Sequence, residues 1–103
     1  MIRHLVHLRF AKSTTETDKQ AIYDQLAGLS DRIDGILEFQ HRRNVSVELP
    51  LVRGFNDMFW FDFADVTVRN AYLEDSVHKA IGAQIVARLE GGAGGVFVCD
   101  IEI

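Results

Sequence analysis

The sequence predicts an α+β fold in which one four-stranded antiparallel sheet carries its helices on one face. Three observations support this. Four segments alternate between two faces, as strands do, and the remaining segments repeat apolar residues at helical spacing. Along the chain these segments follow one another as strand, helix, strand, strand, helix, strand. A length of 103 residues suits one domain of this kind, and we expect residues 1–103 to form it.

The first half of the chain supplies a strand, a helix and a second strand. Residues 2–10 alternate, and His4 shares their apolar face. Ser13 and Glu16 have the spacing of a capping box, which predicts that a helix begins there. Residues 36–47 alternate again and predict the second strand.

The second half begins with a hairpin loop that has an apolar tip and contains the only proline, Pro50. Residues 56–64 form the third predicted strand, which is apolar on both faces: Phe59, Phe61 and Phe63 on one, Met58 and Trp60 on the other. A short helix capped by Asp65, a second helical segment over residues 77–89 and a last strand over residues 96–103 complete the chain. This order is that of a ferredoxin-like sandwich.

Helices on one face leave the other face of the sheet bare. We expect the phenylalanine face of the third strand to pack against the helices. The bare face is then expected to expose a patch larger than monomers usually leave open, formed by Leu5, Met58, Trp60, Val96 and Val98. Burial of this patch against a second copy predicts a homodimer.

Composition excludes several classes of partner. The 11 Lys and Arg residues against 15 Asp and Glu residues give a net charge of −4 without any basic block, which disfavours nucleic acid and anionic membrane surfaces. No apolar run approaches the roughly 20 residues of a membrane span. The lone cysteine, Cys99, and the charged residues near the N-terminus predict a cytoplasmic protein. The histidines have no metal-ligand spacing, and we expect neither a metal nor a cofactor.

The chain resembles the stress-responsive dimeric α/β-barrel domain family from end to end. The resemblance is carried by four stretches: His4-Leu5-Val6-His7-Leu8-Arg9-Phe10, Gly54-Phe55, Phe61-Asp62-Phe63 and Tyr72-Leu73-Glu74-Asp75-Ser76-Val77-His78. It implies that two ferredoxin-like chains press their sheets together into an eight-stranded barrel. It also implies a family with many uncharacterised or non-enzymatic members beside enzymes that cyclise polyketides.

Family members often have a tyrosine, two variable residues, His-Pro, one variable residue and a histidine. This chain keeps Tyr72 and His78 but has Asp75 and Ser76 in place of the His-Pro pair. The resemblance implies that His78 accepts a proton and that Tyr72 donates a hydrogen bond to a carbonyl oxygen, without a cofactor. With Asp75 at the position of the first histidine, the resemblance implies no role for that histidine here.

The residues themselves place a candidate cavity between the helices and the sheet. On one unbroken helix, Tyr72 and His78 would point about 120° apart, whereas a helix break at Asp75 lets them converge. Gly82, one turn after His78, leaves room beside the imidazole, and His4 is expected to form a wall of the cavity.

Two hypotheses remain open for this cavity, which Phe59 and Phe61 are expected to line. The first is an uncharacterised dimeric protein with a small apolar-ligand cavity and no assigned chemistry. The alternative is a cofactor-independent cyclase-type or lyase-type enzyme acting on a small apolar carbonyl compound, with His78 as general base. If Phe59, Phe61 and Phe63 fill the cavity, no ligand can enter it, and Tyr72 and His78 then have a structural role only.

Overall fold

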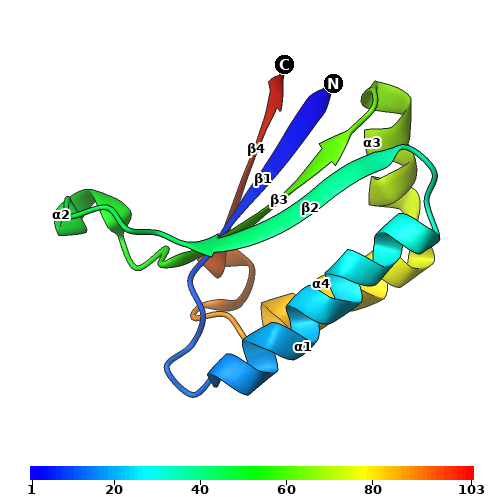
Figure 1. The fold of residues 1–103 in the computed structure, drawn as a ribbon. Helices are drawn as coiled ribbons and strands as arrows, with labels where there is room; N and C mark the ends of the chain where they lie inside the picture. Colours follow the sequence, from blue (N-terminus) through cyan, green and yellow to red (C-terminus); the bar gives the residue numbers. More distant parts are fainter.

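A computed structural model describes all of residues 1–103, and a four-stranded antiparallel sheet is at its centre. The strands are β1 (Ile2–Leu8), β2 (Ile36–Arg43), β3 (Asp57–Phe63) and β4 (Val96–Glu102). They lie side by side in the order β2-β3-β1-β4. The predicted ferredoxin-like arrangement is confirmed, and the single sheet is open rather than closed into a barrel (Figure 1).

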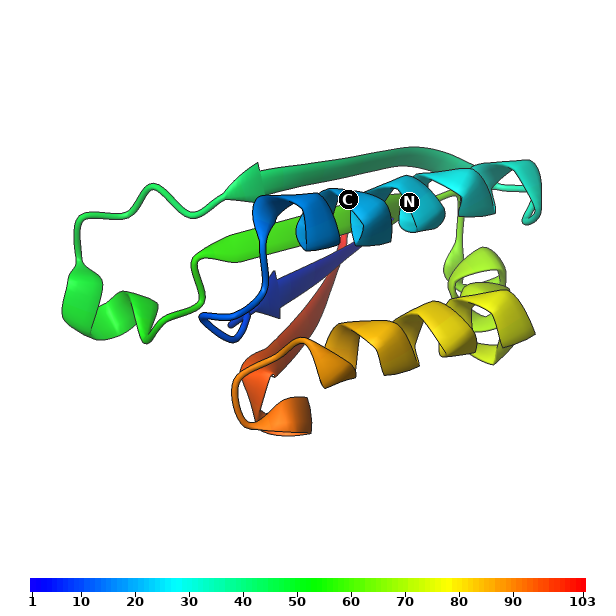
Figure 2. The ribbon, with the colours of Figure 1, turned by 90° about the horizontal axis from the view of Figure 1, so that it is seen from below.

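Three helices cover one face of the sheet. They are α1 (Glu16–Ala27), α3 (Val66–Glu74) and α4 (Ser76–Ala87). The view from below shows α1 and α4 crossing that face, with α3 at one end (Figure 2). Short 3-10 turns follow α1 at Gly28–Asp31 and precede β4 at Gly92–Gly95. No helix is long and apolar enough to span a membrane.

The start of α1 differs from the prediction. Thr15, not Ser13, is the N-cap, and its side chain accepts a hydrogen bond from the Asp18 backbone N at 3.1 Å. The Asp18 carboxylate accepts one from the Thr15 backbone N at 3.0 Å, which completes the capping box. The threonines next to Ser13 offer the same capping chemistry, so spacing alone did not choose between them.

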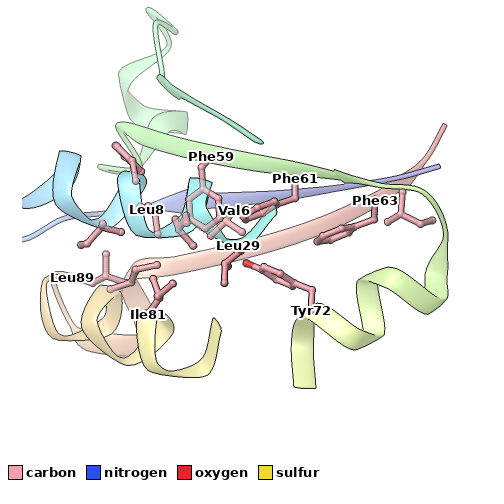
Figure 3. Close-up of a cluster of buried hydrophobic side chains, with 14 residues drawn as sticks. Val6, Leu8, Leu29, Phe59, Phe61, Phe63, Tyr72, Ile81 and Leu89 are labelled. Carbon is pink, nitrogen blue, oxygen red and sulfur yellow. The ribbon is translucent and has the colours of Figure 1, made fainter. Parts of the chain in front are cut away.

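The core lies between the helices and the sheet face that carries the phenylalanines (Figure 3). Phe61 and Phe63 are fully buried, and their rings stack with centroids 5.6 Å apart. Tyr72 packs against both of them from α3. The alternation predicted for β3 is therefore correct about which face packs on the helices.

The prediction for β4 was wrong about its faces. Val6 of β1 is paired with Val98, and Leu8 is paired with Val96, so both valines of β4 lie on the helix face. Phe97 is instead on the open face and is exposed. Because β4 is apolar on both faces, its alternation could not show which face meets the helices, and only the pairing with β1 decides.

The open face of the sheet combines apolar side chains with an ion pair. The Arg3 guanidinium donates to both carboxylate oxygens of Asp62, with the shorter contact at 2.8 Å, and the Asp62 side chain is only 4% exposed. Arg3 and Arg42 lie against the Trp60 ring, 5.9 and 5.6 Å from its centroid. The remaining apolar residues of this face are Leu5, Met58, Phe97, Cys99 and Ile101.

The connection between β2 and β3 projects beyond the body of the protein (Figures 1 and 2). Residues 44–56 form this segment, here called the arm, and they include the short helix α2 (Leu49–Val52). Four of its aliphatic side chains are 66–90% exposed: Val45, Val47, Leu49 and Leu51. The predicted hairpin loop with an apolar tip is present, and the helical turn within it was not foreseen.

Candidate functional site

A cavity of about 260 Å³ lies between the sheet and the α3–α4 helices. Most of its wall is apolar, and no Lys, Arg, Asp or Glu side chain lines it. The lining residues are His4, Val6, Phe59, Tyr72, Leu73, His78, Gly82, Ile85, Val86, Val96 and Val98. Strands β1, β3 and β4 supply one wall and the two helices the other.

The chain break at Asp75 brings Tyr72 and His78 together. Asp75 ends α3 in an extended conformation and is the N-cap of α4, where its carboxylate accepts a hydrogen bond from the His78 backbone N at 2.9 Å. Arg32 holds the same carboxylate at 2.8 Å. The rings of Tyr72 and His78 lie 3.9 Å apart between centroids. A restarted helix thus replaces the divergence that one continuous helix would impose.

The electrostatic environment keeps His78 uncharged at neutral pH. Burial is the largest cause that lowers its pKa below the ordinary value, followed by the charge that His4 can carry. The Asp75 carboxylate and the backbone carbonyls of Tyr72 and Leu73 act in the opposite direction but are outweighed. The Nδ1 atom of His78 is buried without a hydrogen-bond partner.

Tyr72 is also held in its neutral form. Its side chain is almost fully buried, and burial, with a smaller contribution from the Asp100 charge, raises its pKa above the ordinary value. The phenol therefore keeps its proton at neutral pH and can donate a hydrogen bond. The close-up shows this side chain extending from α3 beneath the sheet, with its oxygen at the leading end (Figure 3).

The other predicted lining residues divide into two groups. His4, Phe59 and Gly82 line the cavity, and a Cβ atom placed on Gly82 meets nothing within 4 Å. The expectation that Phe61 lines the cavity was wrong, because this ring is fully buried in the core between Phe63 and Tyr72. The rings of Phe59, Phe61 and Phe63 pack against one another along β3, and the cavity beside Gly82 stays open.

Two further residues belong to the surroundings of this cavity and were missed in the sequence. Asp100 of β4 lies beside His4, with 2.6 Å between its Oδ1 and His4 Nδ1. Arg69 of α3 donates from Nη1 to the other oxygen of Asp100 at 2.7 Å. The signal that could have revealed Asp100 was its place opposite His4 in the sheet, which requires the β1–β4 register.

A second hollow, of about 310 Å³, lies between α1 and the β2–β3 edge and is polar. Lys19 Nζ contacts Asp57 at 3.1 Å and Glu16 at 3.3 Å there, whereas Arg42 and Arg43 line the hollow without a carboxylate partner. Nowhere in the chain do three or more His, Cys, Asp or Glu side chains gather as a metal site would require.

Comparison with known families matches residues 2–103 to the stress-responsive A/B barrel domain. The chain belongs to this family. No curated protein sequence matches it. The family resemblance seen in the sequence is therefore confirmed, and the family itself does not assign a specific function.

Similar proteins of known structure share this fold, and two of the three that follow are dimeric. A dimeric ferredoxin-like protein of unknown function from Jannaschia sp. CCS1 is 27% identical, with a TM-score of 0.88 over 99% of this chain and 98% of that one. A dimeric ferredoxin-like protein of unknown function from Thermobifida fusca is 17% identical, with a TM-score of 0.74 over 99% and 90%. A hydroxynitrile lyase from Passiflora edulis is 14% identical, with a TM-score of 0.82 over 99% and 92%.

Proposed function

We propose that this protein binds a small, uncharged and largely apolar compound with a carbonyl oxygen in the cavity beside Gly82. One observation carries the proposal: three residues with polar groups, His4, Tyr72 and His78, line an otherwise apolar cavity. A charged ligand would lose its hydration there without a counter-ion, so a neutral one is favoured. The volume of about 260 Å³ is below the roughly 300–1,000 Å³ of sites for drug-sized molecules, which favours a small ligand.

A cofactor-independent enzyme is the second candidate, and the close approach of Tyr72 to His78 favours it. A neutral His78 can accept a proton from the carbon beside the carbonyl group of a bound ketone. The electron pair of the broken C–H bond then forms a C=C bond, and the carbonyl π electrons move to oxygen. The neutral Tyr72 hydroxyl would stabilise that oxygen by donating a hydrogen bond. Reprotonation at carbon reverses these steps.

Acetophenone in D₂O tests both functions, because it is neutral, mostly apolar and able to form an enol. Ligand-observed NMR measures binding, and mass spectrometry measures deuterium in its methyl group. Binding without catalysed exchange supports the binding protein. Catalysed exchange that falls in both His78→Ala and Tyr72→Phe, but not in the exposed control Lys79→Ala, supports the enzyme. If neither acetophenone nor other small neutral ketones bind, the proposed function is wrong.

We also propose that two copies associate through the open sheet face, in line with the dimers found among solved relatives. Trp60, Met58 and Phe97 give this face an apolar surface that the helices do not cover. The arm extends the apolar surface beyond the sheet through side chains that contact little within their own chain. Light scattering at micromolar concentration is expected to give twice the 11.6 kDa mass of the chain. A stable monomer would contradict this proposal.

We further propose a cytoplasmic location. The lone cysteine, Cys99, is a free thiol on the open sheet face, which is typical of a protein kept in a reducing compartment. Fractionation of cells that make the tagged protein tests this, and recovery outside the cytoplasmic fraction would contradict it.

A further inference from the structure

A chain of polar contacts links three elements behind the cavity. His4 Nδ1 of β1 lies 2.6 Å from Asp100 Oδ1 of β4, and Asp100 Oδ2 accepts a hydrogen bond of 2.7 Å from Arg69 of α3. The His4 side chain is 7% exposed, whereas Asp100 and Arg69 are about one quarter exposed. The histidine is thus the inner end of the chain and the arginine its outer end.

These contacts determine which nitrogen of His4 carries the proton. Burial raises the pKa of Asp100, but the hydrogen bonds from Arg69 and His4 together hold it below its ordinary value. The carboxylate is therefore ionised at neutral pH and can only accept hydrogen bonds. Because Asp100 accepts from Nδ1, a neutral His4 has its proton on Nδ1 and a free lone pair on Nε2.

The other ring nitrogen of His4 is free. His4 lines the cavity, and its Nε2 is neither hydrogen-bonded within the chain nor fully buried. Its ring meets Tyr72 edge to face, with centroids 5.4 Å apart. Tyr72 therefore contacts two histidine rings, His4 from β1 and His78 from α4.

We propose that His4 is a second proton-transfer group of the cavity and that Asp100 and Arg69 are its positioning residues. This proposal rests on the proposed function, in which the cavity holds a neutral carbonyl compound. In this proposal His4 does more than line the cavity: its Nε2 accepts a proton, and the contact of Nδ1 with Asp100 fixes the orientation of the ring.

Two histidines suit a reaction that moves protons at two atoms of one ligand: one ring, in its protonated form, gives a proton to one ligand atom while the other, neutral, accepts a proton from the second, so that the pair holds one proton throughout. When His4 Nε2 accepts a proton from the ligand, the new imidazolium is stabilised by the Asp100 carboxylate, which stays ionised. The charged and titratable groups around His4 are Asp100 from β4, Arg69 and Tyr72 from α3, and His78 from α4. Strand β3 contributes only aromatic rings at this point. A charge on His4 lowers the pKa of His78, so a proton on one ring opposes a proton on the other.

The substitution Asp100→Asn tests the positioning role. Arg69 would keep the Asn oxygen as its acceptor, which turns the Asn amide N–H groups toward His4 Nδ1. The ring is then expected to carry its proton on Nε2, and the acceptor facing the cavity is lost. ¹⁵N NMR of the histidine side chains distinguishes the two forms directly. Arg69→Ala is expected to weaken the preference for Nδ1–H, Arg69→Lys to restore it, and the remote control Arg88→Ala to leave it unchanged.

Phenol, a neutral O–H donor, serves as the probe of the cavity. In the unaltered protein phenol is expected to shift the Nε2 signal of His4, and in Asp100→Asn this shift is expected to be lost while the melting temperature shows that the variant is folded. Where acetophenone exchange is catalysed, Asp100→Asn is expected to lower its rate about 10²–10⁴-fold. If His4 acts in proton transfer, Asp100→Asn is expected to bind acetophenone as tightly as the unaltered protein does while its exchange rate falls.

The outcomes separate this inference from the proposed function. If the unaltered protein binds phenol but carries the His4 proton on Nε2, or if Asp100→Asn leaves the proton position and the exchange rate unchanged, the role assigned to His4 is wrong and the ligand cavity stands. If neither phenol nor acetophenone binds, the proposed function is wrong, and the transfer role of His4 is wrong with it.

Discussion

Replacement of Gly82 by alanine is expected to stabilise the protein. Gly82 lies inside α4 and lines the cavity, and a Cβ atom added there meets nothing within 4 Å. Alanine is favoured over glycine inside a helix by about 0.5–1 kcal/mol, and no clash opposes this gain. Small domains shift by about 4–8 °C per kcal/mol, so the melting temperature is expected to rise by about 2–8 °C.

Thermal unfolding followed by circular dichroism measures the effect of Gly82→Ala. The protein concentration must be held fixed, because the melting temperature of a dimer depends on it. Ala83→Gly is the matched control: Ala83 is the next residue of the helix and is exposed, so its change reports helix propensity alone. Its melting temperature is expected to fall by a similar amount. A lower melting temperature for Gly82→Ala would refute the reasoning, because it would mean that the added methyl group meets a neighbour.

A larger side chain at the same position tests the cavity itself. Gly82→Leu places four carbon atoms in the space beside His78 and Tyr72, so binding of acetophenone is expected to be lost while the fold is kept. Ala83→Leu adds a comparable side chain to the solvent side of α4 and is expected to leave binding unchanged. If Gly82→Leu binds acetophenone as well as the unaltered protein does, the ligand site is elsewhere.

Three further predictions follow from charges near the open face and the cavity. Trp60→Lys adds a third cation beside two flanking arginines, so it is expected to break the dimer, and an unchanged mass in light scattering would count against this interface. Because the folded pKa of His78 is lowered from 6.5, the unfolded chain binds the proton first, and stability is expected to fall as the pH drops below about 6.5. His78→Gln should flatten that decline in urea unfolding at pH 7.5 and 5.5, and an equal decline in both proteins contradicts it. Arg3→Ala leaves the buried Asp62 carboxylate without its partner and is expected to lower the free energy of unfolding, measured in urea, whereas no change would show that water replaces the guanidinium.

The fold could be predicted from the sequence wherever the two faces of a strand differ clearly in composition. The alternation of β1 and the phenylalanine face of β3 identified the layer that packs on the helices, because a one-residue slip would move those side chains to the opposite face. Strand β4 offered no such contrast. With Val96 and Val98 on one face and Phe97 and Ile101 on the other, only its pairing with β1 orients it.

The candidate site could be predicted where it depends on local sequence signals, and not where it depends on the pairing of distant strands. Tyr72 and His78 come together through Asp75, a local helix break whose capping chemistry is visible in neighbouring residues. Asp100 is 96 residues from His4 in the sequence, and their contact exists only because β4 pairs with β1 in one register. A register shifted by one residue would send the carboxylate to the open face and leave His4 facing an apolar neighbour. The pairing of β4 with β1 therefore does more than complete the sheet. It decides whether the Asp100 carboxylate lies beside His4 Nδ1, which local sequence patterns cannot show.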